Sequence, residues 1–378
     1  MKLYNKAILP QGFKAAAVAS GIKKSGKLDL ALLYSDKPAK AACVFTANTI
    51  QAAPLLLNKK NLKANKLYRA IIVNSGNANC FTGQAGLKDA QETARLLARA
   101  LGVNKKNILV ASTGIIGKKL PLDKIKKAIP HLVLAISKGG INRANKAIMT
   151  TDTFTKEITA KFQIGNCPVS ICGIAKGAGM IAPNMATMLV FIMTDVNITQ
   201  PALDKALRTA VDNSFNCITV DGCMSTNDMV SILANGAIKN PIIDFNNHFK
   251  LFNSALNLVC LGLAKMIVQD AEGSTKFIKI NVRQARTFGE AKKIALAIAN
   301  SNLFKTAIYG ENPNFGRIVA AAGSSGVEIK EKELKIKVSP LHKKNIDIQV
   351  SLNRGNASAI VYTSDLTPEY IKINAAYN

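Results

Sequence analysis

Apolar and polar residues follow two different periods along this chain, and the two periods alternate. Ala70–Asn79 (AIIVNSGNAN) is a continuous apolar run that ends in an asparagine and glycine turn, as in a buried strand. Apolar residues then recur at three- and four-residue spacing from Leu87 to Leu101, directly before Gly102, as in an amphipathic helix with a glycine stop. Ile108–Gly117 (ILVASTGIIG) repeats the strand pattern. This alternation predicts an α/β protein.

The same patterns predict most of the remaining elements. We expect helices over 122–129, ended by Pro130, from Pro201 onward, over 249–268 and over 288–299. We expect strands over 188–193, 278–282 and 305–309, and three alternating strands in the tail. No repeat, low-complexity tract or linker marks a domain border in this composition.

One stretch, Lys176–Phe191 (KGAGMIAPNMATMLVF), carries the most specific chemistry. Gly177 and Gly179 allow close backbone approach, and turn residues follow just before Ala186 and Thr187. In a strained bend the Thr187 hydroxyl could attack the preceding carbonyl, and hydrolysis would then free the Thr187 α-amino group. Nucleophile and base would sit on one residue. The alternative is that the glycine loop only leads into a strand.

The composition and net charge of the chain disfavour several classes of function. The chain has 378 residues, of which 48% are hydrophobic, and no sustained apolar run near the N-terminus, so we expect a soluble cytoplasmic protein without a membrane span. The formal net charge of +27 raises nucleic-acid binding as a rival, but lysine doublets are dispersed along the chain, which disfavours it. Three histidines and seven unclustered cysteines leave little for a Ser/His/Asp site or a zinc site, so we expect no metal and no cofactor.

Many segments of the chain resemble, in order, those of the ornithine acetyltransferase family, the bifunctional glutamate N-acetyltransferases. They are GFKAAAVASGIKKSGKLDLAL, VFTANTIQAAP, NSGNAN, STGIIG, TTDTF, KGAGMIAPNMATMLVF, SFNCITVDGCMSTND, DAEGSTKF, TAIYGENPNFGRIVAAAG and DLTPEYIKINAAY. The resemblance implies an α/β fold with sheets sandwiched by helices, in an architecture of the self-cleaving N-terminal-nucleophile type. It also implies transfer of acetyl from N2-acetylornithine to glutamate in arginine biosynthesis.

The resemblance also implies roles for individual residues. Cleavage between Ala186 and Thr187 would give an α chain, 1–186, and an interlocked β chain, 187–378, with Thr187 as the nucleophile. Thr113 and Gly114 would form the oxyanion hole, although a strand-end Thr-Gly pair is otherwise an ordinary turn. The implied substrate contacts, in addition to Thr187, are Thr153, Lys176, Glu272 and Asn374.

The chain departs from the family pattern in three places. Ala271 stands where the family has glycine, and Cys223–Met224 stand where it more often has polar residues. The family also has a substrate-binding hydroxyl just past the position of Asn374, which this sequence does not reach before Asn378. A self-cleaving aminopeptidase or amidase of related fold is the alternative function. The resemblance suggests a dimer of cleaved αβ heterodimers and leaves open whether acetyl-CoA is also a donor.

Overall fold

A computed structural model of the chain describes residues 1–182 and 188–376. These residues form two compact units. The first unit consists of 1–177, 188–213 and 225–263, and the second of 178–182, 214–224 and 264–376. Each unit therefore takes segments from both sides of position 186.

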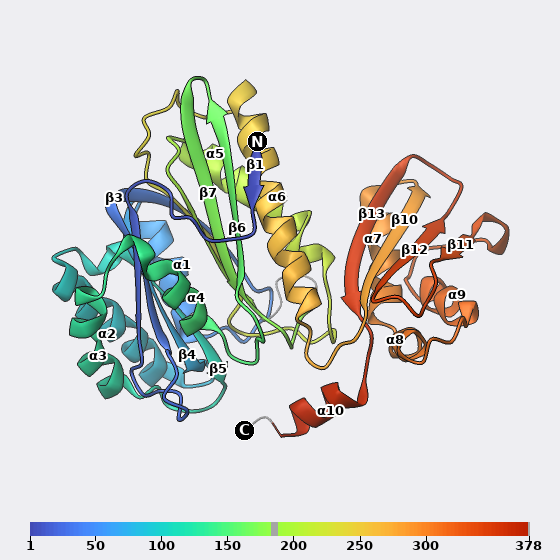
Figure 1. Ribbon diagram of the computed structural model, residues 1–378, viewed down its shortest axis with the longest axis horizontal. Helices are drawn as coiled ribbons and strands as arrows, with labels where there is room; N and C mark the ends of the chain where they lie inside the picture. The colour runs from blue at the N-terminus through green and yellow to red at the C-terminus, as the bar shows by residue number, and fades with distance from the viewer. Residues whose placement is uncertain (183–187, 377–378) are drawn as a thin grey trace. The chain divides into compact units, whose positions relative to one another are not determined.

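The first unit is built on nine strands. Their order is β1-β6-β7-β8-β9-β3-β4-β5, with β2 paired to β3 (Figure 1). The bounds are β1 (Lys2–Tyr4), β2 (Phe13–Val18), β3 (Leu30–Phe45), β4 (Tyr68–Asn77), β5 (Ile108–Ile115), β6 (Lys156–Ile164), β7 (Cys167–Lys176), β8 (Leu189–Thr194) and β9 (Met229–Ala234). Strand β8 lies between β7, to which it is antiparallel, and β9, to which it is parallel.

Strand β3 divides this sheet into two halves that pack on each other. Its first part pairs with β2 and β4, its second part pairs with β9, and the register shifts between Tyr34 and Ala39. Ala31 and Leu33 belong to a core shared with β7, β8 and β9, whereas Leu30 and Leu32 face helices α1, α2 and α3. This alternation follows from the two-residue period of a strand. The unit is thus a pair of stacked sheet halves with helices outside.

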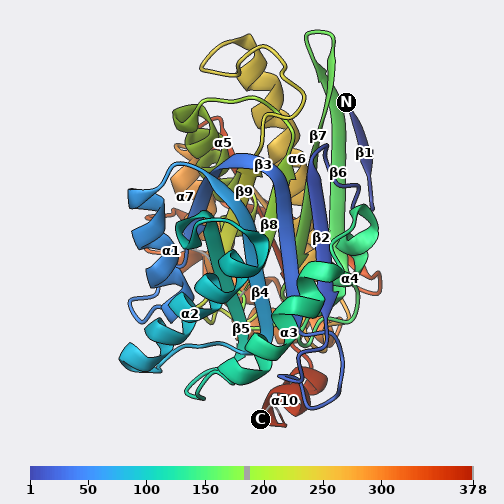
Figure 2. The same ribbon diagram turned by 90° about the vertical axis from the view of Figure 1, so that its left-hand side faces the viewer.

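Helices cover the outer faces of the first unit. Figure 2 shows α1, α2 and α3 on one side. The bounds are α1 (Ala53–Ala64), α2 (Gly83–Leu101), α3 (Leu122–Leu134), α4 (Ile141–Ile148), α5 (Gln200–Asp212) and α6 (Asn247–Gln269), the last of which continues into the second unit.

Helix α6 lies unusually close to β6 and β7. A methyl group added at Gly262 would overlap the Ile158 side chain, and one at Gly173 would overlap Val259 and Leu263. Among the described helices α6 is long and apolar enough to cross a membrane by length and composition, a feature that the sequence analysis missed. Half of its apolar stretch is buried within the protein, as in the core helix of a globular unit.

The second unit is smaller. Its four strands follow the order β11-β12-β10-β13, and alternate residues of β10, including Ile278, Ile280 and Val282, are buried under helices. The strands are β10 (Phe277–Ala285), β11 (Lys335–Val338), β12 (Asn345–Ser351) and β13 (Ala357–Ser364). The helices are α7 (Phe288–Asn300), α8 (Asn302–Tyr309), α9 (Phe315–Gly323) and α10 (Pro368–Ala375).

Most predicted elements are confirmed, and two predictions are wrong. Helix α3 does not end at Pro130 but runs to Leu134. Pro130 lies on the exposed face, where water can solvate the carbonyl that its ring displaces. The predicted strand over 305–309 is helix α8, because Ser301 caps the amide of Phe304 and the buried residues recur at helical spacing. The α/β class with sheets between helices is confirmed.

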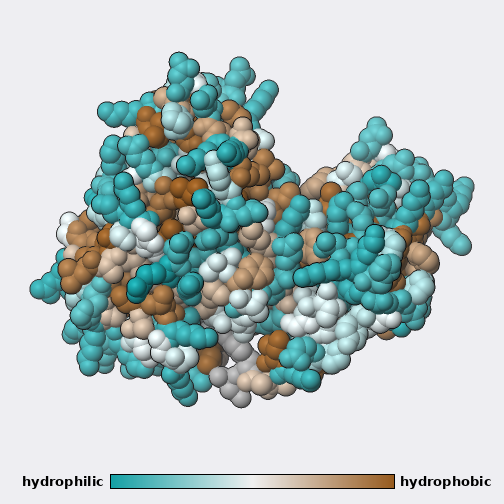
Figure 3. Space-filling model, in the orientation of Figure 1, coloured by the Kyte–Doolittle hydropathy of each residue, from teal (hydrophilic) through white to brown (hydrophobic). Residues whose placement is uncertain are grey.

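Hydrophilic residues cover much of the face shown in Figure 3, with apolar residues scattered among them. The lysine doublets at 105–106, 118–119, 126–127 and 343–344 are all exposed, and they come from separate elements and loops of both units. The charge excess is therefore a distributed surface property, as the sequence analysis expected.

Candidate active site

The predicted oxyanion residues lie at the end of β5. Thr113 is buried and pairs with the end of the parallel strand β4, where a register shift occurs at Gly76 and Asn77. Gly114 has φ +133°, and a methyl group there would overlap the backbone of Gly76 and Asn77. Only glycine fits this close approach. The NSGNAN and STGIIG turns are thus adjacent.

Polar side chains hold these two strand ends in place. Ser112 donates its hydroxyl to Asn74 Oδ1 at 2.6 Å, and Asn74 Nδ2 donates to Asn77 O at 2.8 Å. Asn227 Nδ2 donates to Ala78 O at 2.6 Å and to Ser112 O at 2.8 Å. One buried amide therefore joins the turn after β4 to the strand that carries Thr113.

The neighbouring residue, Asp228, binds the start of β8. Its Oδ1 accepts a hydrogen bond of 2.9 Å from the amide of Met188, and the carboxyl is fully buried. Burial raises the pKa of this carboxyl well above its usual value. Asn227 and Asp228 thus connect the turn at Thr113 to the residue that follows Thr187 in sequence.

A second cluster in the first unit centres on Asp152, next to Thr153. Its Oδ1 accepts from Lys156 Nζ at 2.7 Å and from the Gly177 amide at 2.7 Å, and its Oδ2 accepts from the Thr150 amide at 3.0 Å. Lys176 Nζ lies 4.0 Å from Oδ2, and both side chains are almost fully buried. Asp152 therefore fixes the start of the glycine loop.

Burial and neighbouring charges shift the pKa values of Asp152 and Lys23. Burial favours a raised pKa for Asp152, but the charges of Lys176 and Lys156 and the hydrogen bonds from Lys156 and Gly177 together lower that pKa. Lys23 lies within electrostatic range of Asp152 and Lys176. Burial lowers the pKa of its ammonium to about 8, and the charge of Lys176 also acts to lower it. Lys23 Nζ donates to Leu28 O at 3.0 Å and to Met149 O at 2.7 Å, so it ties the segment before Asp152 to the loop after β2.

The second unit holds the other predicted substrate contacts. Asn374, on α10, donates from Nδ2 to Glu272 Oε2 at 2.9 Å. The Glu272 amide donates to Ala178 O at 3.1 Å, so this turn also contacts the glycine loop. A methyl group at Gly179 would overlap the Glu272 carboxylate. The structure thus brings together Gly179, Glu272 and Asn374, three residues far apart in sequence.

Some predictions lie outside the described residues. These are Ala186, Thr187 and the bond between them, and also the last two positions of the chain, 377–378. The departure at Ala271 leaves the Glu272 carboxylate in contact with Asn374. At a second departure, the amide of Cys223 donates to Asp221 Oδ1 at 3.1 Å.

Comparison with known proteins identifies the family. A model of the ArgJ family matches residues 14–378. The chain belongs to the ArgJ family.

Individual ArgJ relatives match along almost the whole chain. The "Arginine biosynthesis bifunctional protein ArgJ" of Geobacter sulfurreducens is 44% identical over 389 residues, covering 97% of this chain and 99% of the relative. The protein of the same name from Caldanaerobacter subterraneus subsp. tengcongensis is 43% identical over 400 residues, covering 99% of each.

Two solved ArgJ structures are also similar, each over about half of this chain. The crystal structure of the Bacillus halodurans bifunctional ArgJ protein is 34% identical, with a TM-score of 0.46, and covers 49% of this chain and 98% of its own. The Mycobacterium tuberculosis ornithine acetyltransferase in complex with ornithine is 40% identical, with a TM-score of 0.45, and covers 48% and 97%.

Sequence reasoning about this ArgJ chain missed the acids that support the site. Asp152, Asp221 and Asp228 all lie inside the quoted motifs, yet none was singled out. Each carboxylate accepts at least one backbone amide of the segments that flank 183–187. Asp152 and Asp221 stand beside threonine or glycine in short polar segments, where side chains commonly accept backbone hydrogen bonds, but Asp228 stands between Asn227 and Met229. This local pattern does not distinguish them from ordinary turn aspartates.

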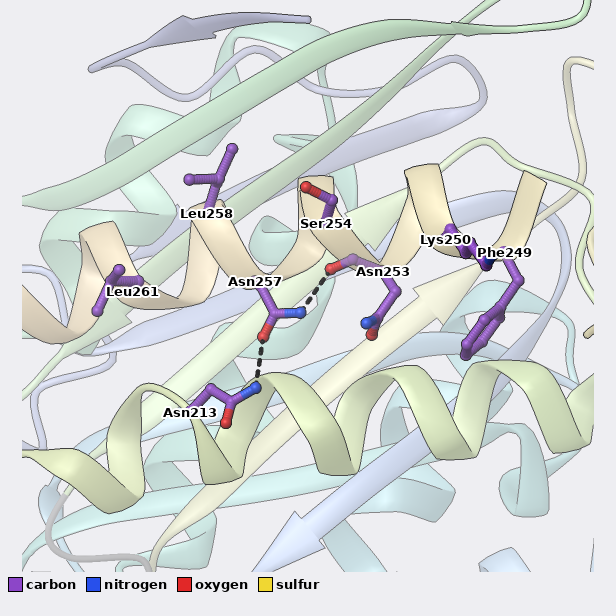
Figure 4. Close-up of a pocket in the computed structure, with 8 residues that line it drawn as sticks. All are labelled: Asn213, Phe249, Lys250, Asn253, Ser254, Asn257, Leu258 and Leu261. Carbon is purple, nitrogen blue, oxygen red and sulfur yellow. Dashed lines mark hydrogen bonds between the residues drawn. The ribbon is translucent and has the colours of Figure 1, made fainter. Parts of the chain in front are cut away.

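A separate groove lies between the end of α5 and α6 in the ArgJ chain. It has a volume of about 460 Å³ and is lined by Asn213, Phe249, Lys250, Asn253, Ser254, Asn257, Leu258 and Leu261. Figure 4 shows Asn257 bonded both to Asn213 and to the backbone of Asn253. None of the described site residues lines this groove, so we assign it no part in the chemistry.

Proposed function

We propose that this chain moves the acetyl group of N2-acetylornithine to glutamate, giving ornithine and N-acetylglutamate. The observation that carries the proposal is membership of the ArgJ family over residues 14–378, with relatives named for arginine biosynthesis at about 44% identity. The residues that we propose to contact the substrate, in addition to Thr187, are Thr153, Lys176, Glu272 and Asn374.

In the proposed reaction, the chain first cleaves itself between Ala186 and Thr187. The freed α-amino group then takes the proton of the Thr187 hydroxyl, and the oxygen attacks the acetyl carbonyl. The bond from the acetyl carbon to the nitrogen of ornithine breaks, and that nitrogen leaves with a proton. Glutamate's amine next attacks the acetyl ester and releases Thr187.

The described residues suit the remaining roles. Thr113 and Gly114, at the rigid end of β5, would stabilise the tetrahedral oxyanion. Lys176 would bind a substrate carboxylate, with Asp152 holding its position, and Thr153 would contact the substrate beside it. Glu272 would pair with the side-chain ammonium of ornithine, and Asn374 would contact the substrate carboxylate.

We further propose that acetyl-CoA serves as a second donor, in keeping with the word "bifunctional" in the names of the relatives. We expect a cytoplasmic dimer of cleaved αβ heterodimers. The self-cleaving amidase alternative would use water as acceptor, and the family membership does not favour it.

Denaturing mass spectrometry of the purified protein tests the first step, and we expect fragments 1–186 and 187–378. Thr187→Ala should abolish cleavage and activity, whereas Thr187→Ser should retain part of both. A single intact chain in fully active enzyme would refute the mechanism. Thr113→Ala should lower kcat by about 10²–10³ with normal folding.

Kinetics test the covalent step. Acetylornithine alone should add one acetyl group to fragment 187–378, and double-reciprocal plots at several glutamate levels should be parallel. Intersecting lines without an acetylated fragment would mean direct transfer. Acetylornithine turnover that does not depend on glutamate would identify a hydrolase instead.

A further inference from the structure

Four donors converge on the carboxylate of Asp221, a residue to which the proposed reaction gives no role. Oδ2 accepts from the Met180 amide at 2.6 Å and from the Tyr370 hydroxyl at 3.2 Å. Oδ1 accepts from the Ile181 amide at 2.9 Å and from the Cys223 amide at 3.1 Å. A carboxylate that accepts this many hydrogen bonds fixes the position of every group that donates to it.

Two of these donors belong to the loop that leads to the predicted cleavage bond. Met180 has φ +56°, a left-handed conformation that is unfavourable for a residue with a side chain. The Asp221 carboxylate binds both its amide and the next one. Ile181 O in turn accepts from the Val220 amide at 2.8 Å. The loop is therefore held in a strained conformation just before residues 183–187.

A third donor belongs to helix α10. Tyr370 lies one turn before Asn374, whose Nδ2 donates both to Tyr370 O at 3.0 Å and to Glu272. Burial raises the pKa of the Tyr370 hydroxyl, and the charge of Asp221 raises it further, so the hydroxyl remains a donor. The bond from Tyr370 to Asp221 thus anchors the helix that carries Asn374.

We propose that Asp221 is a positioning residue that serves both stages of this enzyme. Through Met180 and Ile181 it holds the loop in the conformation needed for self-cleavage, and through Tyr370 it holds Asn374 and its partner Glu272 for substrate binding. The inference rests on the proposed function, because it assigns Asp221 to the same cleavage and the same substrate. It predicts that the two effects can be separated by mutation.

Two substitutions make the separation. Tyr370→Phe removes only the bond to α10, so cleavage should proceed at the wild-type rate while KM for acetylornithine rises on the order of tenfold and kcat changes little. Asp221→Asn replaces one acceptor oxygen with a donor, so cleavage should slow by about tenfold or more and KM should rise as well. Cleavage is followed by denaturing mass spectrometry after pulsed expression, and kinetics use fully cleaved enzyme.

The matched controls lie in the same unit. Tyr309→Phe changes an exposed tyrosine on α8, and Asp347→Asn changes an aspartate that pairs with Lys279 on the sheet. Both should leave cleavage and KM unchanged. Met180→Gly, introduced into Asp221→Asn, should restore part of the cleavage rate, because glycine adopts the left-handed conformation without strain. This rescue also tests the proposal if Asp221→Asn alone is poorly folded.

Two results would overturn the assignment of Asp221: wild-type cleavage in Asp221→Asn, or equal slowing of cleavage in Asp221→Asn and Tyr370→Phe. An unchanged KM in Tyr370→Phe would overturn the link to α10. If wild-type protein neither cleaves nor transfers acetyl, the proposed function itself fails, and that outcome is recognised before any variant is compared.

Discussion

Asn374 Nδ2 donates a hydrogen bond of 2.9 Å to Glu272 Oε2, across 102 residues of sequence. The amide belongs to an exposed position of α10, and the carboxylate belongs to the turn after α6. The two residues proposed to contact opposite charges of one substrate therefore also hold each other. Each sets the orientation of the other before any substrate arrives.

This pairing predicts a specific kinetic effect of Asn374→Ala. The Glu272 carboxylate would lose its partner and sample other rotamers, so KM for acetylornithine should rise by about 10–100-fold, the equivalent of one hydrogen bond to a charged group. Self-cleavage should remain at the wild-type rate, as mass spectrometry would show. Asn353→Ala, which alters an exposed asparagine bonded to Glu333 O, is the control. Unchanged KM in Asn374→Ala would mean that the pairing is incidental.

Gly179→Ala should separate function from stability. The added methyl would overlap the Glu272 carboxylate, which is the flexible end of a side chain and can move away. We therefore expect a change in the free energy of unfolding of less than about 1 kcal/mol but a loss of acetylornithine affinity of tenfold or more. Steady-state kinetics and urea unfolding measure the two quantities.

Gly139→Ala is the matched control for Gly179→Ala. Gly139 has no atom within 4 Å of the added methyl, and its backbone is not left-handed. Both kinetics and stability should remain as in the wild type. If Gly179→Ala also keeps wild-type affinity for acetylornithine, the contact between Gly179 and Glu272 does not contribute to substrate binding.

Asp152→Asn should destabilise the protein in a pH-dependent way. At pH 7 it removes the carboxylate from the fully buried Lys156 ammonium, which we expect to lower the free energy of unfolding by about 3–5 kcal/mol. The folded-state pKa of Asp152 is lowered, so its contribution is present above the unfolded value of about 4 and disappears as the pH falls through the folded value. The difference between variant and wild type should shrink correspondingly below about pH 4.

Two further variants check this assignment of Asp152. Adding Lys156→Met to Asp152→Asn should recover part of the lost stability, because no charge then remains to be buried at that position. Asp36→Asn breaks an exposed pair with Lys14 and should change the free energy of unfolding by no more than about 1 kcal/mol. A pH-independent effect of Asp152→Asn would contradict the charge argument.

Lys305 predicts that the free energy of unfolding also rises with pH on the alkaline side. Its buried ammonium donates to Val220 O and Thr363 Oγ1, and burial lowers its pKa from 10.5 to about 8. Between pH 8 and 10.5, Lys305 therefore carries a proton in the unfolded chain but has lost it in the folded protein. The free energy of unfolding should therefore rise with pH from about 8 to 10.5, by up to about 1.4 kcal/mol per pH unit.

Lys305→Met should remove this contribution to the slope, as urea unfolding at pH 7.5, 8.5 and 9.5 would measure. Lys332→Met alters an exposed lysine in the same unit and should leave the slope as in the wild type. Identical pH dependence in wild type and Lys305→Met would show that the ammonium is not desolvated.

Local patterns predicted much of this fold. The helix that ends at Gly102 is confirmed, because both its apolar spacing and its left-handed stop, with φ +67°, depend on neighbouring residues only. Pro130 and α8 show the limit of such reasoning. Whether a proline interrupts a helix depends on whether it lies on the exposed or the buried face, which is set by tertiary packing. A helix of eight residues has too few turns for its periodicity to be distinguished from that of a strand.

The supporting acids of the candidate site were beyond sequence reasoning for a different reason. Asp152 and Asp221 resemble ordinary turn aspartates until the chain brings Gly177 or Tyr370 to them from 25 or 149 residues away. Their importance lies in the number of donors that converge on each carboxylate. That number is a property of tertiary packing, which no spacing along the chain encodes.

The order of the strands in the first unit has a consequence for the fragments of a cleaved chain. Strands β8 and β9 follow the predicted cut, yet they lie between β7 and β3, which precede it. Cleavage would leave two polypeptides joined by backbone ladders on both sides of this pair, so gel filtration without denaturant should not separate them. Reassembly from isolated fragments would be a bimolecular reaction whose rate depends on protein concentration, whereas the uncut precursor folds at a rate independent of it.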